Sequence, residues 1–281
     1  MIEIDHDCSC EKNPLIPSVC RVIEITEETK DVKSFKVQTL EGERPFDFSP
    51  GQLGMLGLPA FGESMFCVSM GGDNWIEFTV KKVGTVTERL HLLYPGSQVS
   101  VRGPYGNRWP LEQCKGRDML FVAGGIGLPP VRSFLLHTLS NRSDYGQINL
   151  VYSAASKADL VFKRQLFEEW PREKNTHIHV SVYHGSEDWD GEVAYTAAFL
   201  ESLKLETGNT TAVLCGGPSL YRTCLKALSA MGISDENIIT TLEMRMKCGI
   251  GKCGRCNVGS KYICLDGPVF SQAEVNSMLK D

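Results

Sequence analysis

The sequence predicts a β plus α/β protein: an antiparallel β-barrel, a doubly wound parallel-sheet domain and a small cysteine-rich C-terminal segment. Residues 14–112 contain short β-like runs broken by Gly and Pro, which are typical of a barrel. Strand and helix patterns alternate over residues 113–242, which is typical of a parallel sheet. Four cysteines lie within residues 243–281, and the polar residues 1–13 are expected to form a tail.

Alternating side chains identify the strands of the expected barrel. Phe35, Val37 and Thr39 alternate with polar residues, and the stretch 76–80 does the same. A period of two means that one face of each strand is buried. A short helix is expected from Thr87 to Tyr94, with Thr87 as its N-cap.

The second domain is expected to alternate compact apolar strands with amphipathic helices. Phe162, Leu166 and Trp170 are spaced four residues apart, which places them on one face of a helix. The expected strands are 119–123, 148–153, 177–183, 211–215 and 238–242, and the other expected helices are 129–139, 193–203 and 219–231.

Composition limits the class of protein. The chain has 281 residues, is 42% hydrophobic and 22% charged, and carries a net charge of −5, so it suits a globular protein without the basic footprint of a nucleic-acid binder. No stretch matches a membrane span, and the acidic N-terminus does not resemble a signal peptide. Eleven cysteines, an odd number, therefore predict reduced thiols or metal ligands in a cytoplasmic protein.

The C-terminal cysteines carry the most specific pattern. Cys248, Cys253, Cys256 and Cys264 follow the spacing C-x4-C-x2-C-x7-C, and the first three match plant-type [2Fe–2S] proteins. Interspersed glycines allow the backbone to curl around the inorganic sulfide. A zinc knuckle is the alternative, although zinc sites usually pair two short Cys-x2–4-Cys hairpins.

Two glycine turns predict a nucleotide crevice. Each follows a strand and opens a helix, where backbone amides can face a pyrophosphate. A tight strand–helix turn without a ligand is the alternative. The candidate NAD(P) residues are Gly124, Gly125, Gly127, Leu128, Pro129, Ser153, Cys215, Gly216, Gly217 and Pro218.

The choice between NAD and NADP stays open at this point. The strand that ends at Ser153 has no acid at its end, and Lys157, Lys163 and Arg164 follow nearby. An acid would bind the ribose of NAD, whereas a base accepts the extra phosphate of NADP.

The order of these parts resembles the ferredoxin–NADP reductase superfamily. It is most similar to electron-transfer subunits with a C-terminal [2Fe–2S] site: the gamma subunits of cytoplasmic NiFe (sulf)hydrogenases, the corresponding subunit of anaerobic sulfite reductase and the electron-transfer subunit of dihydroorotate dehydrogenase. The resemblance covers residues 14–270, and its most specific part runs from Leu242 to Phe270.

The resemblance implies that the barrel binds FAD. In the family motif R-x-[YF]-S, Ser64 stands here in place of Arg and Cys67 in place of Ser, so the usual cation–pyrophosphate contact is replaced. The turn before the short helix is the expected substitute for it. The candidate FAD residues are Ser64, Phe66, Cys67, Val68, Thr79, Val80, Lys81, Gly84, Thr85, Val86 and Thr87.

Three residues are catalytic candidates by the same resemblance. Cys67 would lie near the reactive flavin nitrogen, Cys215 near the contact between nicotinamide and flavin, and Glu243 beside the flavin. The alternatives are buried structural cysteines and an ordinary surface acid. Cys8 and Cys10 lie in the expected tail, where they are either disordered or ligands of a further metal.

The expected function is a diaphorase-type electron-transfer subunit. Nicotinamide gives up two electrons as hydride and an iron–sulfur cluster carries one at a time, so a flavin must lie between them. The chain shows no NiFe, sirohaem or orotate site, so the terminal reaction is expected in partner subunits. The alternatives are a stand-alone NAD(P)H:ferredoxin reductase and a zinc-stabilised nucleotide-binding regulator without redox activity.

Overall fold

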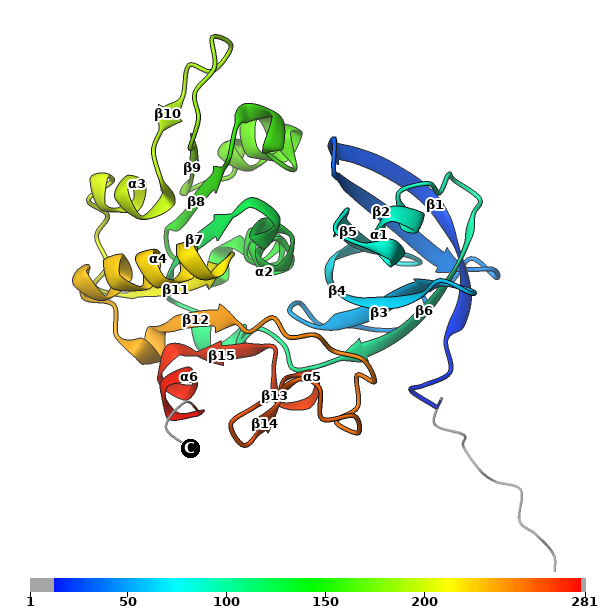
Figure 1. Cartoon of the computed structure of the whole chain (residues 1–281). Coiled ribbons are helices and arrows are strands. Elements are labelled where there is room, and N and C mark those ends of the chain that lie inside the picture. Colours follow the sequence, from blue (N-terminus) through cyan, green and yellow to red (C-terminus); the bar gives the residue numbers. More distant parts are fainter. Residues whose placement is uncertain (1–12, 279–281) are drawn as a thin grey trace, which may run out of the picture.

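The structure, a computed structural model, describes residues 13–278. Figure 1 shows a β-barrel lying beside an α/β sheet, with the C-terminal segment below both of them. The linker after β6 crosses from the barrel to the sheet. Cys8 and Cys10, with nearly all of the expected tail, lie outside the described residues.

Six antiparallel strands close the barrel in the order β1-β2-β5-β4-β3-β6. The predicted alternation is confirmed, because Phe35, Val37, Ile76, Phe78 and Val80 all pack into one apolar core. In β5, however, Glu77 and Thr79 on the opposite face are buried as well, so the expectation of a single buried face is wrong for this strand. The strands are β1 Ser18–Thr29, β2 Val32–Thr39, β3 Leu53–Leu58, β4 Gly62–Gly71, β5 Ile76–Lys81 and β6 Gln98–Tyr105.

The second sheet has the order β10-β9-β8-β7-β11-β12-β15, with β15 as an antiparallel edge strand. From β7 the chain adds β8 and β9 on one side and later β11 and β12 on the other. The carboxyl ends of β7 and β11 therefore flank the topological switch point, where open α/β sheets bind ligands. The strands are β7 Asp118–Gly124, β8 Ile148–Ala154, β9 Thr176–Val182, β10 Glu192–Val193, β11 Thr210–Cys215, β12 Ile238–Thr241 and β15 Val269–Ser271.

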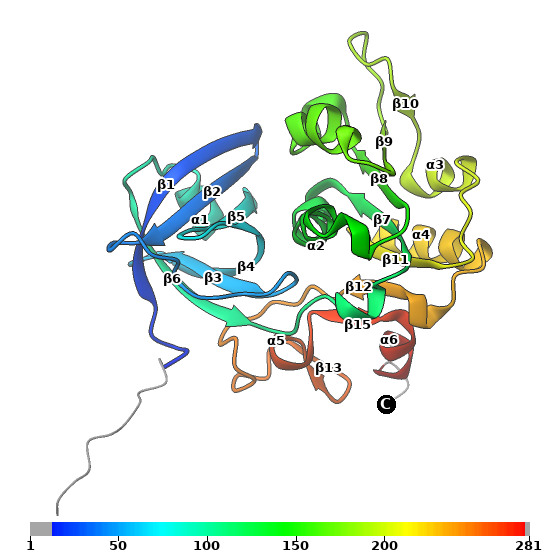
Figure 2. The same ribbon diagram turned by 180° about the vertical axis from the view of Figure 1, so that it is seen from behind.

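Helices cover both faces of this sheet (Figure 2). In β7, Met119 and Phe121 pack into the same core as α2, whereas Leu120 and Val122 pack into the core of α3 and α4. Burial on both faces explains the continuous apolar run of this strand. The helices are α1 Thr85–Leu90, α2 Leu128–Ser140, α3 Thr196–Ser202, α4 Pro218–Ala230, α5 Ile263–Asp266 and α6 Gln272–Met278.

Three predicted helices differ from the structure. The predicted helix 193–203 begins only at Thr196, because Val193 belongs to β10. The short helix α1 begins at Thr85, and Gly84 rather than Thr87 is its N-cap residue. The Thr87 hydroxyl instead accepts hydrogen bonds from the N–H groups of Val83 and Gly84, so it closes the turn from inside the helix. The predicted helix around 162–170 is a π-helix, Gln165–Glu169, followed by a 3₁₀ turn, Trp170–Arg172, and Phe162 lies outside both with φ of 55°.

The C-terminal segment contacts both larger units. It contains the hairpin of β13 (Asn257–Val258) and β14 (Lys261–Tyr262), then α5, β15 and α6. Because β15 pairs with β12, this segment adds a strand to the parallel-sheet domain. Among residues 13–278, no helix combines the length and apolar character of a membrane span.

Candidate functional site

The four C-terminal cysteines lie in a loop whose amides face their sulfurs. The N–H groups of Ile250 and Cys253 point at Sγ of Cys248, at 3.5 and 3.4 Å, and the N–H of Gly251 points at Sγ of Cys264, at 3.2 Å. Burial raises the pKa of the Cys248 thiol, but these amides outweigh burial and bring it to about 6. A thiolate is the form that binds metal, so Cys248 is suited to ligation. Burial, with the neighbouring Cys256, instead raises the pKa of Cys264 to about 12.

The thiols associate in two pairs. Cys248 interacts with Cys253 through its side chain, and Cys264 interacts in the same way with Cys256. In the described part of the chain, no three His, Cys, Asp or Glu side chains are placed to hold a metal ion together. A [2Fe–2S] cluster has two irons with two cysteine ligands each, so the pairing fits it better than a single zinc ion, which needs four converging ligands.

A cavity of about 530 Å³ opens on the outside of the barrel, within the size range of cofactor sites. We call it the barrel cavity. Trp109 lines it and is 1% exposed, yet its indole N–H has no hydrogen-bond partner among residues 13–278. A buried donor without a partner is costly, so this cavity suits a ligand with hydrogen-bond acceptors such as a flavin ring. The predicted FAD residues that line it are Ser64, Phe66, Cys67, Thr79, Lys81 and Thr87.

Other predicted FAD residues point away from the barrel cavity. Val68 and Val80 are fully buried in the barrel core, and Val86 packs against it, so their side chains do not reach a cofactor. In β5, Val80 lies between Thr79 and Lys81, which do line the cavity, as the period of two requires. Gly84 and Thr85 do not line the cavity, and the Gly84 amide is engaged by Thr87.

One wall of the barrel cavity was not predicted from the sequence. Residues 241–246 border it from beyond the sheet, although only Glu243 of this stretch had been expected beside the flavin, and Gly51 and Trp109 border it from the barrel side. A Cβ on Gly51 would lie 2.7 Å from the Trp109 backbone nitrogen, so only glycine fits there. No local pattern marks these residues, because distant segments meet there only in the fold.

A second cavity, of about 800 Å³, lies at the carboxyl ends of β7 and β11. We call it the sheet cavity. Gly124, Gly125, Gly217 and Pro218 line it, as predicted for a nucleotide crevice. The two glycine turns also touch, because a Cβ on Gly127 would collide with the carbonyl of Cys215.

Six predicted NAD(P) residues do not line the sheet cavity. Two of them, Gly127 and Gly216, pack against each other where the two glycine turns touch. Leu128 is buried in the domain core, and Pro129 lines the barrel cavity instead. Ser153 is fully buried, where its hydroxyl contacts that of Ser181 at 2.8 Å. Cys215 lines neither cavity, is 2% exposed, and its thiol contacts the Thr241 hydroxyl at 3.1 Å.

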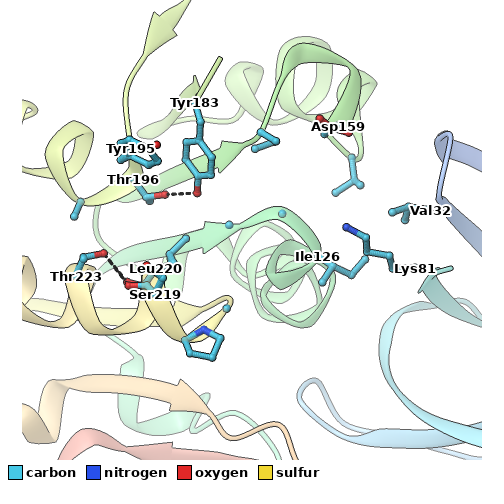
Figure 3. Close-up of a pocket in the computed structure, with 18 of the residues that line it drawn as sticks. Val32, Lys81, Ile126, Asp159, Tyr183, Tyr195, Thr196, Ser219, Leu220 and Thr223 are labelled. Atoms are coloured by element: carbon cyan, nitrogen blue, oxygen red, sulfur yellow. Dashed lines mark hydrogen bonds between the residues drawn. The ribbon is translucent and has the colours of Figure 1, made fainter. Parts of the chain in front are cut away.

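Figure 3 shows how the two ends of the sheet cavity differ. Tyr183, Tyr195 and Thr196 lie together at one end, with the two tyrosine rings 4.9 Å apart. Val32 and Lys81 of the barrel lie at the other end, and the Lys81 side chain points into the cavity. The paired aromatic rings offer a stacking surface for a base.

Asp159 also lines the sheet cavity and was not among the predicted residues. Its carboxylate accepts a 2.7 Å hydrogen bond from the Ser156 hydroxyl. None of the three nearby bases lines the cavity, since each makes contacts elsewhere. Lys157 pairs with Asp188, Lys163 contacts the carbonyls of Glu28 and Ala158, and Arg164 pairs with Glu169.

The three catalytic candidates lie near one another. Burial raises the pKa of Cys67, and the thiol of Cys215 and the carboxyl of Glu243 raise it further. Burial and Glu243 raise the pKa of Cys215 to about 12, and desolvation raises that of Glu243. Both thiols are therefore protonated at neutral pH, which excludes a thiolate nucleophile and suits apolar packing beside a cofactor.

The three sites adjoin. Lys81 and Ile126 line both cavities, so the sheet cavity opens onto the barrel cavity. The wall formed by residues 241–246 continues within two residues to Cys248. The barrel cavity therefore lies between the sheet cavity and the cysteine loop.

Comparison with known proteins agrees with this arrangement. The family "Oxidoreductase NAD-binding domain" matches residues 121–226, and "Iron-sulfur cluster binding domain of dihydroorotate dehydrogenase B" matches residues 243–276. The two matches cover the sheet cavity's glycine turns and all four loop cysteines.

Similar proteins extend over almost the whole chain. Sulfhydrogenase 1 subunit gamma of Pyrococcus furiosus is 38% identical over 267 residues, covering 92% of this chain and 91% of that protein. A probable dihydroorotate dehydrogenase B (NAD(+)) electron transfer subunit of Methanocaldococcus jannaschii is 32% identical, covering 90% and 89%.

A solved structure of an NADH-dependent reduced ferredoxin–NADP oxidoreductase has the same fold, with a TM-score of 0.75 and 21% identity over 92% of this chain and 91% of that one. This chain therefore belongs to the family of NAD-binding, iron–sulfur electron-transfer subunits that includes the sulfhydrogenase gamma subunits and the electron-transfer subunits of dihydroorotate dehydrogenase B.

Proposed function

We propose that this protein is the NAD(P)H-linked electron-transfer subunit of a cytoplasmic multisubunit redox enzyme, with FAD in the barrel cavity and a [2Fe–2S] cluster on the cysteine loop. The observation that carries the proposal is the position of the barrel cavity between the other two sites, joined to one by Lys81 and Ile126 and to the other by residues 241–246. Because a sulfhydrogenase gamma subunit is 38% identical to this chain, we propose a hydrogenase-type partner.

The chain's own residues bind and orient the reactants. When bound, a flavin exchanges hydride with nicotinamide and single electrons with an iron–sulfur cluster. The glycine turns at Gly125 and Gly217 allow close approach of a pyrophosphate to helix N-termini. Trp109 would offer its buried N–H to a bound flavin ring, and Cys67, whose pKa is raised by burial, would pack beside it as a neutral thiol.

We propose further that the sheet cavity prefers NAD(H) to NADP(H). Among residues 155–164, which follow β8, Asp159 is the only titratable residue that lines this cavity, and a ribose diol can hydrogen-bond to its carboxylate. A 2′-phosphate would face the same negative charge. Lys157, the nearest base in sequence, is held by Asp188 at 3.0 Å.

Asp159→Asn tests this preference. Removing one negative charge at ~4 Å in water is worth about 1 kcal/mol, so we expect kcat/KM for NADPH to rise about fivefold relative to NADH. Asp144→Asn, at a carboxylate that contacts Lys115 away from the cavity, is the matched control. An unchanged ratio of the two coenzymes in D159N would contradict the assignment.

The main proposal is tested on the purified chain with its partners absent. We expect one flavin, two irons and two sulfides per chain, reduction of an artificial acceptor by NADH, and no hydrogenase or sulfite reductase activity. Cys256→Ser is expected to lose the iron and keep the flavin. A protein that contains zinc in place of iron and shows no flavin absorbance would instead favour a zinc-stabilised nucleotide-binding regulator without redox activity. Efficient reduction of free ferredoxin, with no subunits co-purifying from the host, would favour a stand-alone reductase.

A further inference from the structure

Arg102 of β6 joins the barrel to the start of the cysteine loop, and all five of its N–H donors are used. Nε donates to Glu63 at 2.8 Å, and Nη2 donates to the same carboxylate and to the Lys247 carbonyl at 3.1 Å. Nη1 donates to the Tyr105 hydroxyl at 2.6 Å and to the Cys248 carbonyl at 2.8 Å. One side chain therefore holds the backbone of a cluster ligand 146 residues away.

The burial of Arg102 shows that this contact is not a surface ion pair. The side chain is 5% exposed, and that of Glu63 is 34% exposed. A buried charge is tolerated only when it is paired and its donors are satisfied. Lysine offers three donors from a single point, whereas arginine offers five in a planar fork, so only arginine can make the whole set.

Asn107, just beyond β6, holds the other end of the loop. Its side-chain amide donates to the carbonyls of Asp266 and Val269 at 3.0 and 2.7 Å, and its side-chain oxygen accepts from the N–H of Val269 at 2.9 Å. The backbone N–H of Asn107 donates to the Gly267 carbonyl. The four cysteines thus lie between two attachments to one short stretch of the barrel.

Close packing accompanies both attachments. A Cβ on Gly249, which has φ of +79°, would lie 2.9 Å from the Tyr105 ring. A Cβ on Gly106, with φ of +74°, would collide with the Gly267 backbone. The loop backbone therefore lies directly on the barrel at each end.

We propose that Arg102 is the positioning residue of the cysteine loop: with Asn107 it fixes the loop on the barrel, and with Glu63 it sets the charge beside Cys248. This inference rests on the proposed function, because it assigns the loop a [2Fe–2S] cluster. Arg102 touches the backbone of a ligand and not the reacting atoms, so it acts through Cys248.

The opposite charges of Arg102 and Glu63 predict the direction in which each substitution shifts the reduction potential of the cluster. Reduction adds one negative charge to a cluster, and cluster potentials depend on nearby charge and hydrogen bonds. Removing the positive charge of Arg102 disfavours the reduced state, whereas removing the negative charge of Glu63 favours it. If the pair had a purely structural role, the Arg102 and Glu63 variants would not be expected to shift the potential in opposite directions.

The experiment compares five forms of the full chain: wild type, Arg102→Lys, Arg102→Gln, Glu63→Gln and Asn107→Ala. Lys36→Gln, at a surface pair with Glu24 on the same barrel, is the control. Iron and sulfide content, iron loss to a chelator and the midpoint potential from an EPR-monitored titration are measured, with flavin content as the check that the barrel has folded.

We expect iron loss on the order of tenfold faster in R102Q and N107A than in wild type, as for other residues that support metal ligands. The potential falls in R102Q, rises in E63Q and stays nearest to wild type in R102K. If R102Q does not fold, a raised potential in E63Q together with a near-wild-type potential in R102K still supports the sign, and a lowered or unchanged potential in E63Q contradicts it.

Two results overturn the inference. One is a wild-type rate of iron loss in R102Q, and the other is a shift of the potential in the same direction, or no shift, in R102Q and E63Q. A wild-type protein that contains flavin but no iron overturns the proposed function as well. An iron-loaded wild type with unresponsive variants overturns this inference alone.

Discussion

Two buried arginines, each paired with a glutamate, connect the barrel to the rest of the chain in different ways. Arg132 of α2 reaches Glu77 of the barrel, and their side chains are 6% and 5% exposed. Arg102 of the barrel pairs with Glu63 of the barrel itself, donates to the Tyr105 hydroxyl, and donates its remaining two N–H groups to carbonyls of the loop. Arg132 therefore contacts a carboxylate of the other unit, whereas Arg102 contacts backbone carbonyls of the cysteine loop.

The surroundings of Arg132 are all side chains. Nε donates to the Gln165 side chain at 2.8 Å, Nη2 contacts the Met70 sulfur at 3.3 Å, and the guanidinium lies 4.2 Å from the centre of the Phe162 ring. Glu77 also accepts a 3.1 Å hydrogen bond from the Ser69 hydroxyl. Every partner in this contact can be removed by substitution.

The difference indicates what each contact fixes. A contact between side chains selects the orientation of two units that each have their own core. A contact with backbone carbonyls fixes the path of a short loop that has little core of its own, whatever side chains it carries. The first contact is therefore expected to dominate global stability, and the second to dominate the local site.

Arg132→Leu gives the largest expected effect on stability. It leaves the buried Glu77 carboxylate without its cation, which costs about 3–5 kcal/mol when one partner of a buried pair is removed. Denaturant unfolding measures it, and the double variant R132L/E77Q is expected to recover part of the loss. A cost below about 1 kcal/mol, as for surface pairs, would remove the contrast between the two contacts.

Tyr105→Phe tests the second contact without removing its charge. The hydroxyl accepts from Arg102 and donates to the carbonyl of the exposed Pro14, so its loss leaves one N–H of the buried Arg102 without its partner. We expect a cost of about 1–3 kcal/mol in the unfolding free energy. Tyr94→Phe, at a tyrosine that is 71% exposed, is the control and should change little.

Glu28→Gln changes a carboxyl beside the Arg132–Glu77 contact, next to Phe162, and has the smallest expected effect on stability. Burial raises the pKa of Glu28, which accepts hydrogen bonds from the Phe162 N–H at 2.8 Å and the Ser34 hydroxyl at 2.9 Å. With a folded pKa above the unfolded value of 4.5, the wild type loses stability from this carboxyl as pH rises through that window. E28Q lacks this loss.

The unfolding free energy of E28Q minus that of wild type should therefore increase from pH 4.5 towards neutrality. Urea unfolding at several pH values measures the difference, and Glu24→Gln on the barrel surface serves as control. A constant difference across this range would mean that the Glu28 carboxyl titrates alike in the folded and unfolded chains.

The two cysteine environments show how far local sequence goes. The loop at 248–264 carries its ligands, its glycines and its amides within one short segment, so its chemistry was readable from spacing alone. Cys67 and Cys215 lie 148 positions apart in the sequence, and only the family resemblance suggested that they approach each other. For α1, a propensity rule named Thr87 as the cap, but the turn uses its hydroxyl from within the helix.

By itself the sequence determined the barrel, the alternating sheet, the glycine turns and the cysteine loop, because each depends on periodicity or spacing between near neighbours. Only the tertiary structure decided that residues 241–246 wall the barrel cavity, that Asp159 rather than Lys157 lines the sheet cavity, and that Arg102 holds the cysteine loop. These are contacts between distant segments or choices of side-chain direction, and they arise only when separate units pack together and every buried charge must find a partner.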